Sequence, residues 1–151
     1  MTADPVADAV ADPALPTIYP NLVYRDCPAA IEWLTRVLGF TRHLVVPGET
    51  GYVVHAELRF GNGLVMVTSA RDGRDWLGEP VNRTNVALVA PSAASVDEIH
   101  ARVAASGARI VHPLRDSDFG PYGKSHGFTC LDAEDNRWSV GTYQPAGRAP
   151  A

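Results

Sequence analysis

The sequence predicts an α+β fold of two tandem βαβββ modules whose mixed sheets form a cupped site. Three observations predict it. The order strand–helix–strand–strand–strand occurs twice along the chain. A glycine ends each expected helix, Gly39 in the first copy and Gly107 in the second, and a strand follows both directly. The chain has 151 residues, of which 46% are hydrophobic and 20% charged, which suits one compact domain.

The first module is expected over about residues 17–69. Asp26 can cap its helix through its side-chain carboxylate, and Pro28 stands in the first turn, where a missing N–H costs nothing. An apolar stripe of Ile31, Leu34 and Leu38 marks the face that packs on the sheet. The expected strands are residues 18–24, 41–46, 52–60 and 64–69, and the Gly-Asn-Gly sequence at 61–63 predicts a tight hairpin between the last two.

The second module is expected over about residues 85–143, after a loop at 70–84. Ser95 and Glu98 have the spacing of a capping box. Val96, Ile99 and Val103 form the apolar stripe of the helix that follows. The expected strands are residues 85–89, 109–114, 125–131 and 137–143.

The remaining composition narrows the class of protein. Residues 1–16 and 144–151 have no hydrophobic period, and we expect them to be tails outside the domain of residues 17–143. The net charge is −4 and no basic cluster occurs, so we expect no nucleic-acid partner. No apolar run is long enough to cross a membrane. Cys27 and Cys130 have no metal-ligand spacing, and two reduced thiols predict the cytoplasm.

One strand carries a polar face that is a candidate site. Period-two alternation over residues 53–60 places His55 and Glu57 on the side opposite Ala56 and Leu58. The pair is suited to hydrogen-bond recognition or to acid–base catalysis. A half-exposed strand face with ion pairs explains it equally well.

Three passages together resemble the vicinal oxygen chelate superfamily of glyoxalases, bleomycin resistance proteins and extradiol dioxygenases. They are residues 26–40, ending in Leu-Gly-Phe, residues 55–61, and residues 132–139, with an Asp-x-Glu-x-Asn-x-Trp pattern. Ala133 and Asp135 depart from the family's Asp-Pro-Glu-Gly-Asn turn, but Asp tolerates a positive φ. The resemblance implies a glyoxalase/bleomycin-resistance-like fold, a homodimer and a small-molecule pocket on the cupped side of the sheets.

Metal-dependent members of this superfamily take one ligand from the opening strand and one from the closing strand of each module. The resemblance places these four positions at Tyr19 (or Asn21 in a shifted register), Met66, Asn85 and Ser139. None of these side chains is a strong ligand for a divalent ion. We therefore expect no metal and no other cofactor.

Several further residues are candidates for lining the pocket. Trp76 lies in the long loop, and Phe119 and Tyr122 lie in the late loop; their rings could form apolar walls. His126 begins the strand after that loop and either faces the pocket or caps the strand. The full set of candidate ligand-binding residues is Tyr19, Asn21, His55, Glu57, Met66, Trp76, Asn85, Phe119, Tyr122, His126 and Ser139.

Three functions are compatible with this sequence. The first is a metal-free binding protein resembling bleomycin resistance proteins, which sequesters an antibiotic or metabolite, aromatic or cationic, without chemistry. The second is a lyase, isomerase or dioxygenase-like enzyme that uses His55 and Glu57. The third is a structural or regulatory dimer with a vestigial pocket.

Overall fold

A computed structural model describes residues 15–147. The expected N-terminal tail falls outside the described residues up to position 14, and the expected C-terminal tail falls outside them from position 148. Between these limits, Pro145–Gly147 forms a short 3₁₀ turn within the stretch expected to be a tail.

The first module forms a four-stranded mixed sheet with one helix. Its elements are β1 (Asn21–Tyr24), α2 (Cys27–Trp33), a π-helical turn (Leu34–Leu38), β2 (Thr41–Pro47), β3 (Val53–Phe60) and β4 (Gly63–Ser69). The strand order is β1-β4-β3-β2; β1 is parallel to β4 and the other pairs are antiparallel.

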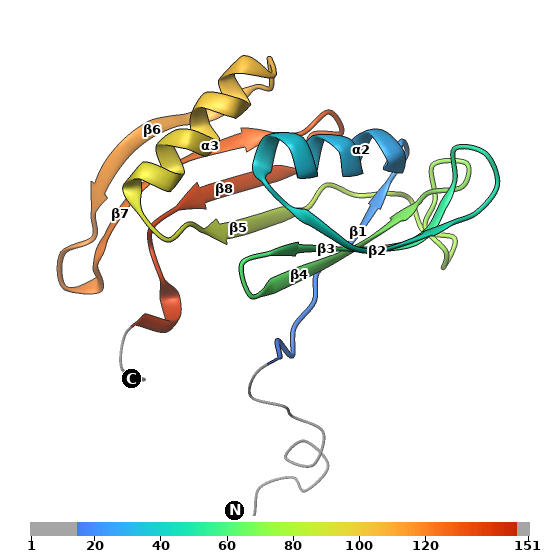
Figure 1. Ribbon diagram of the computed structural model, residues 1–151, viewed down its shortest axis with the longest axis horizontal. Helices are drawn as coiled ribbons and strands as arrows, with labels where there is room; N and C mark the ends of the chain where they lie inside the picture. The colour runs from blue at the N-terminus through green and yellow to red at the C-terminus, as the bar shows by residue number, and fades with distance from the viewer. Residues whose placement is uncertain (1–14, 148–151) are drawn as a thin grey trace, which may run out of the picture.

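The second module repeats this arrangement. Its elements are β5 (Asn85–Val89), α3 (Ala93–Ala105), β6 (Ile110–Asp118), a 3₁₀ turn (Gly120–Tyr122), β7 (Lys124–Leu131) and β8 (Arg137–Gly141). The strand order is β5-β8-β7-β6, again with the first and last strands parallel. The expected fold class of two βαβββ modules is confirmed. Both sheets are open, and Figure 1 shows α2 and α3 on the same side of them.

Local signals explain where the helices begin. The Asp26 carboxylate accepts a hydrogen bond from Ala29 N at 3.1 Å, as expected of an N-cap. The expected capping box at Ser95 and Glu98 is wrong. The cap of α3 is Ser92, whose hydroxyl accepts from Ser95 N at 3.1 Å. Ser92 has the same capping chemistry one turn earlier, so the helix begins there.

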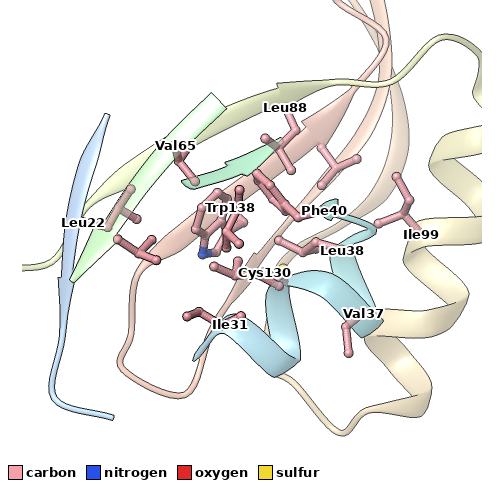
Figure 2. Close-up of a cluster of buried hydrophobic side chains, with 14 of the residues drawn as sticks. Leu22, Ile31, Val37, Leu38, Phe40, Val65, Leu88, Ile99, Cys130 and Trp138 are labelled. Atoms are coloured by element: carbon pink, nitrogen blue, oxygen red, sulfur yellow. The ribbon is translucent and has the colours of Figure 1, made fainter. Parts of the chain in front are cut away.

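A single core joins the two modules. Figure 2 shows Leu38 and Phe40 of the first module among side chains of the second, including Cys130 and Trp138. The rings of Phe40 and Trp138 meet edge to face with centroids 5.7 Å apart. Because each sheet buries its helix-covered face in this core, the opposite face of each sheet is left for other contacts.

Polar contacts also cross between the modules. The buried carboxylate of Asp132 in the second module accepts a hydrogen bond from Tyr24 Oη of the first module at 2.7 Å. Arg102 of α3 donates from Nε to the carbonyl of Val37 at 2.9 Å, which satisfies an acceptor at the end of the first helix. These bonds fix the two sheets relative to each other.

Candidate functional site

A concavity of about 400 Å³ lies over the open face of the second sheet. The strand alternation accounts for its position. Thr129 and Ser139 line it, whereas their neighbours Cys130 and Trp138 are fully buried on the helix-covered face. Ser139 therefore faces the open side of the sheet, and Trp138 faces the helix layer.

The floor of this concavity consists of small side chains. It is formed by Ala87, Ser125, Gly127, Thr129, Ser139 and Gly141. Gly127 pairs with Gly141 across β7 and β8. A Cβ on Gly127 would lie 2.6 Å from the carbonyl oxygen of Val140, so the strands can approach this closely only with glycine there. The consequence is a smooth floor that a flat molecule can lie on.

Aromatic and other side chains form the walls. Phe119 and Tyr143 meet edge to face with ring centroids 5.9 Å apart. Both line the concavity, together with Pro145 from the terminal 3₁₀ turn and Arg115 from β6. An apolar recess with a few polar groups at its edge is typical of a small-molecule site.

Only part of the predicted ligand-binding set lies here. Ser139 and Phe119 line the concavity. The residue in β5 that lies beside Ser139 is Ala87, and Asn85 lies beside Arg137 instead. Which residue of β5 lies beside Ser139 depends on the register between the two parallel strands. The sequence pattern fits Asn85 and Ala87 equally well, because residues two positions apart share a face.

A second group of predicted residues lies on the first sheet. His55 Nε2 is 3.0 Å from Glu57 Oε1, so the expected pair forms. His43 also approaches Glu57, with its Nε2 3.8 Å from Glu57 Oε2. Arg59 Nη2 lies 3.3 Å from His43 Nδ1. All four side chains are partly exposed. This polar cluster can bind a polar group or move a proton.

The start of β3 departs from strict alternation. Val53 is buried and Val54 is 50% exposed, the reverse of the pattern expected from the sequence. Ser69 Oγ accepts from Val53 N at 2.8 Å, and the Thr68 hydroxyl donates to the Val54 carbonyl at 2.8 Å. These side-chain bonds replace part of the sheet ladder and let the backbone shift, which leaves the positions of His55 and Glu57 unchanged.

The four positions at which the resemblance places metal ligands carry no imidazole or carboxylate. Asn21 pairs with Met66 in the first sheet, and Ser139 pairs with Ala87 in the second. Tyr19 precedes β1. The carboxamides of Asn21 and Asn85, the thioether of Met66 and the hydroxyl of Ser139 are not the imidazole or carboxylate ligands that such a divalent ion takes. Asn85 also lies beside Arg137 and not beside Ser139. Within residues 15–147, no group of three or more His, Cys, Asp or Glu side chains is arranged to hold a metal ion.

Two predicted aromatic residues are exposed in loops and do not line the concavity. Trp76 is 71% exposed in the loop before β5, and Tyr122 is 65% exposed in the turn before β7. Hydrogen bonds within the Trp76 loop define its turn: Asp75 Oδ1 accepts from Leu77 N and from Glu79 N, both at 2.9 Å. Neither ring lines the concavity of the second sheet.

His126 faces the helix-covered side of the second sheet. Its Nε2 lies 2.6 Å from Asp97 Oδ1 on α3, and its Nδ1 lies 2.8 Å from Asp116 Oδ1 on β6. These two hydrogen bonds, that of Asp97 first, raise the pKa of His126 above its usual value of 6.5. The side chain therefore joins a helix to two strands and lies outside the concavity.

Several lining residues were not among those predicted. Arg115, Gly127, Gly141 and Tyr143 line the concavity without having been candidates. Side chains two positions apart on a strand share a face, so Gly141 is expected on the same face as Ser139. The same alternation along residues 125–131 places Gly127 on that face. Arg115 has no such signal, because the register between β6 and β7 shifts twice before it.

The chain is similar to known proteins over most of its length. A family model described as the glyoxalase/bleomycin resistance protein/dioxygenase superfamily matches residues 17–140. A comparison with curated protein sequences finds no match.

Solved structures give the same fold. TioX from Micromonospora sp. ML1 is 30% identical, with 84% of this chain and 99% of that chain covered and a TM-score of 0.67. A lactoylglutathione lyase from Agrobacterium tumefaciens is 21% identical, with 83% and 93% covered and a TM-score of 0.58. A glyoxalase/bleomycin resistance protein/dioxygenase from Nocardioides is 21% identical, with 97% and 95% covered and a TM-score of 0.59.

Proposed function

Because the chain belongs to the glyoxalase/bleomycin resistance protein/dioxygenase superfamily, we propose that it is a metal-free protein that sequesters a small antibiotic or metabolite. The observation that carries the proposal is the concavity of about 400 Å³ over the second sheet, with its floor of small side chains and its aromatic wall. The volume suits one small organic molecule. The floor offers no strong nucleophile, since its only polar side chains are the hydroxyls of Ser125, Thr129 and Ser139.

The test is binding without turnover. A panel of aromatic antibiotics and metabolites would be titrated by calorimetry, and the bound compound recovered and analysed by mass spectrometry. We expect stoichiometric binding and an unchanged compound. Ala87→Leu would fill the floor and weaken binding at least tenfold, whereas Ala104→Leu on the exposed side of α3 would not change it.

The metal-free character is tested separately. Protein purified without chelator would be titrated with Zn²⁺, Mn²⁺, Ni²⁺ and Fe²⁺. We expect no stoichiometric binding. The expected ligand positions Asn21, Met66, Asn85 and Ser139 support this expectation, because none of them carries an imidazole or a carboxylate. Stoichiometric binding would make the enzyme hypothesis the leading one.

A second candidate function rests on the polar cluster of His43, His55, Glu57 and Arg59 on the first sheet. A carboxylate between two imidazoles can hold one ring in the tautomer that accepts a proton from a substrate. If the protein is an enzyme of this fold, His55→Ala would abolish turnover. Full turnover in that variant would remove His55 from the mechanism.

We further propose that the protein works as a homodimer. Leu44 and Val46 pair with Glu57 and His55 across β2 and β3, and both apolar side chains are more than a third exposed on the open sheet. A second copy would cover them. Sedimentation would give a dimer mass for the natural chain and a monomer mass for Leu44→Glu.

We also propose that this protein works in the cytoplasm. Cys27 and Cys130 are free thiols, which is the usual state of cysteine in a reducing compartment. Fractionation of the source cells would test this. No helix among residues 15–147 is long and apolar enough to span a membrane.

A further inference from the structure

The concavity over the second sheet differs in charge from the rest of the protein. The chain carries a net charge of −4, with 17 acidic residues against 13 basic ones. The lining includes Arg115 and His112, and no Asp or Glu side chain is among the lining residues. A site with this lining favours an anion over a cation.

The nearest carboxylates on the same strand are engaged elsewhere. Asp116 lies 2.8 Å from His126 Nδ1 on the helix-covered side. Asp118 accepts from Gly120 N at 2.8 Å and lies 4.0 Å from Lys124 Nζ. Neither carboxylate neutralises the Arg115 guanidinium.

Arg115 itself has no protein partner in the part of the chain that the structure describes. Its side chain makes no hydrogen bond or ion pair there, although six other arginines do so: Arg25, Arg42, Arg59, Arg74, Arg83 and Arg102. Arg115 lies opposite Gly127 in the β6–β7 ladder, so its position is beside the glycine floor. A guanidinium offers a fork of donors that matches a carboxylate or a sulfonate.

We propose that the concavity takes a planar aromatic anion, whose ring lies on the Gly127–Gly141 floor against Phe119 and whose acidic group binds Arg115. The inference rests on the proposed binding function and adds the class of ligand and the residue that selects it. It also replaces the cationic alternative named in the first of the three functions, because the charged lining residue of the site, Arg115, is itself a cation.

The experiment compares three probes that share a naphthalene ring and carry a negative, a neutral and a positive substituent. They are 2-naphthoate, neutral 2-naphthamide and cationic 2-(aminomethyl)naphthalene, each titrated by calorimetry into the full chain at one ionic strength. We expect 2-naphthoate to bind at least tenfold more tightly than the amide, and the amine more weakly than both. A charge-assisted hydrogen bond accounts for a difference of this size.

Variants identify the selecting residue. Arg115→Gln would reduce affinity for 2-naphthoate to that of the amide and leave affinity for the amide unchanged. Arg115→Lys would restore part of the preference. Arg109→Gln is the matched control, since it removes one exposed positive charge from the same module outside the lining and would change neither affinity.

The outcomes separate the two proposals. Equal binding of all three probes, unaffected by Arg115→Gln, would overturn the anion inference while the binding function stands. Failure of all three probes to bind would overturn the anion inference and count against the concavity as a small-molecule site. An unfolded Arg115→Gln protein, seen by circular dichroism, would leave the comparison of the probes on the natural chain to decide.

Discussion

At the scale of single residues, His126 occupies a position that only its doubly protonated ring satisfies. Nδ1 faces Asp116 and Nε2 faces Asp97, and both partners are carboxylate oxygens that accept hydrogen bonds. A neutral imidazole has one N–H and would leave one carboxylate facing a lone pair. The raised pKa of His126 follows from this arrangement.

The stability of the protein should therefore depend on pH through His126. The stabilisation that it provides is fully present below the unfolded-state pKa of 6.5 and is lost as the pH rises through the raised folded-state pKa. We expect the difference in Tm between the natural chain and His126→Gln to be largest below about pH 6.5 and to shrink at higher pH. Thermal unfolding from pH 5 to 9 measures it.

A control isolates this contact. Asp118→Asn removes a neighbouring charge without touching His126, so its effect on Tm should not follow the same pH profile. Asp97→Asn should reproduce the profile of His126→Gln. A Tm difference that stays constant over the whole pH range would contradict the assignment.

The two thiols should be inert in the folded protein. Burial is the main cause that raises the pKa of Cys27 to about 11 and that of Cys130 to about 12. Since the thiolate is the reactive form, neither residue should react with a disulfide reagent at pH 8. Under native conditions no thiol would be labelled within minutes, and in guanidinium both would be. Rapid labelling of the folded chain would show that the core opens.

Residue identity predicted some contacts and missed others for definable reasons. The His55–Glu57 pair follows from strand alternation, which depends only on neighbours in the sequence. The partners of His126 lie on α3 and β6, far away in the sequence, so no local pattern indicates them. Trp76 was a pocket candidate because of its ring, but its loop is fixed by Asp75 and its ring is exposed.

At the scale of elements, the turn between β7 and β8 carries a conformational cost. Asp135 has a φ of +66°, in the left-handed region that favours glycine. Asp132 Oδ1 holds the turn by accepting from Glu134 N at 2.9 Å and from Asn136 N at 3.0 Å. The sequence had predicted that Asp135 would take this conformation, and it does.

Glycine at this position should stabilise the fold. Asp135→Gly relieves strain of about 1 kcal/mol, partly offset by about 0.5 kcal/mol of extra unfolded-state entropy. We expect a net gain of about 0.5 kcal/mol in the free energy of unfolding, measured with urea. Asparagine tolerates the same φ, so Asp135→Asn should leave the free energy of unfolding unchanged. This result would exclude loss of the exposed ion pair with Arg83 as the cause of the gain in Asp135→Gly. A loss of stability in Asp135→Gly would contradict this explanation.

Element types were predictable, and element ends were less so. The strand at 85–89 was predicted with the bounds that it has. The start of α3 was misplaced because Ser92 and Ser95 both precede apolar periodic residues, and only the hydrogen bond decides between them. The buried Val53 and exposed Val54 likewise depend on Thr68 and Ser69 of the neighbouring strand.

At the scale of the whole molecule, the duplication predicted both sheets but not how they meet. The shared core arises from contacts between the two modules, and the repeated order of elements within one module does not predict those contacts. The Tyr24–Asp132 hydrogen bond is the shortest of the buried side-chain contacts that join the modules. Burial first, and then the charge of Asp132, raise the pKa of Tyr24, so the phenol stays protonated and remains a donor.

The two modules should therefore unfold as one unit. Tyr24→Phe removes a donor to a buried carboxylate, and we expect a loss of about 1.5–3 kcal/mol in the free energy of unfolding.

Cys27 and Cys130 report on one module each, since each becomes reactive only when its surroundings open. Pulsed thiol labelling across a urea series, with the two peptides resolved by mass spectrometry, would give two unfolding midpoints. We expect them to coincide in the natural chain and to move down together in Tyr24→Phe. Tyr52→Phe, at a tyrosine outside this contact, should leave both midpoints in place. A shift at Cys27 alone would mean that the modules are independent, and the shared core would then have to be weaker than its buried contacts indicate.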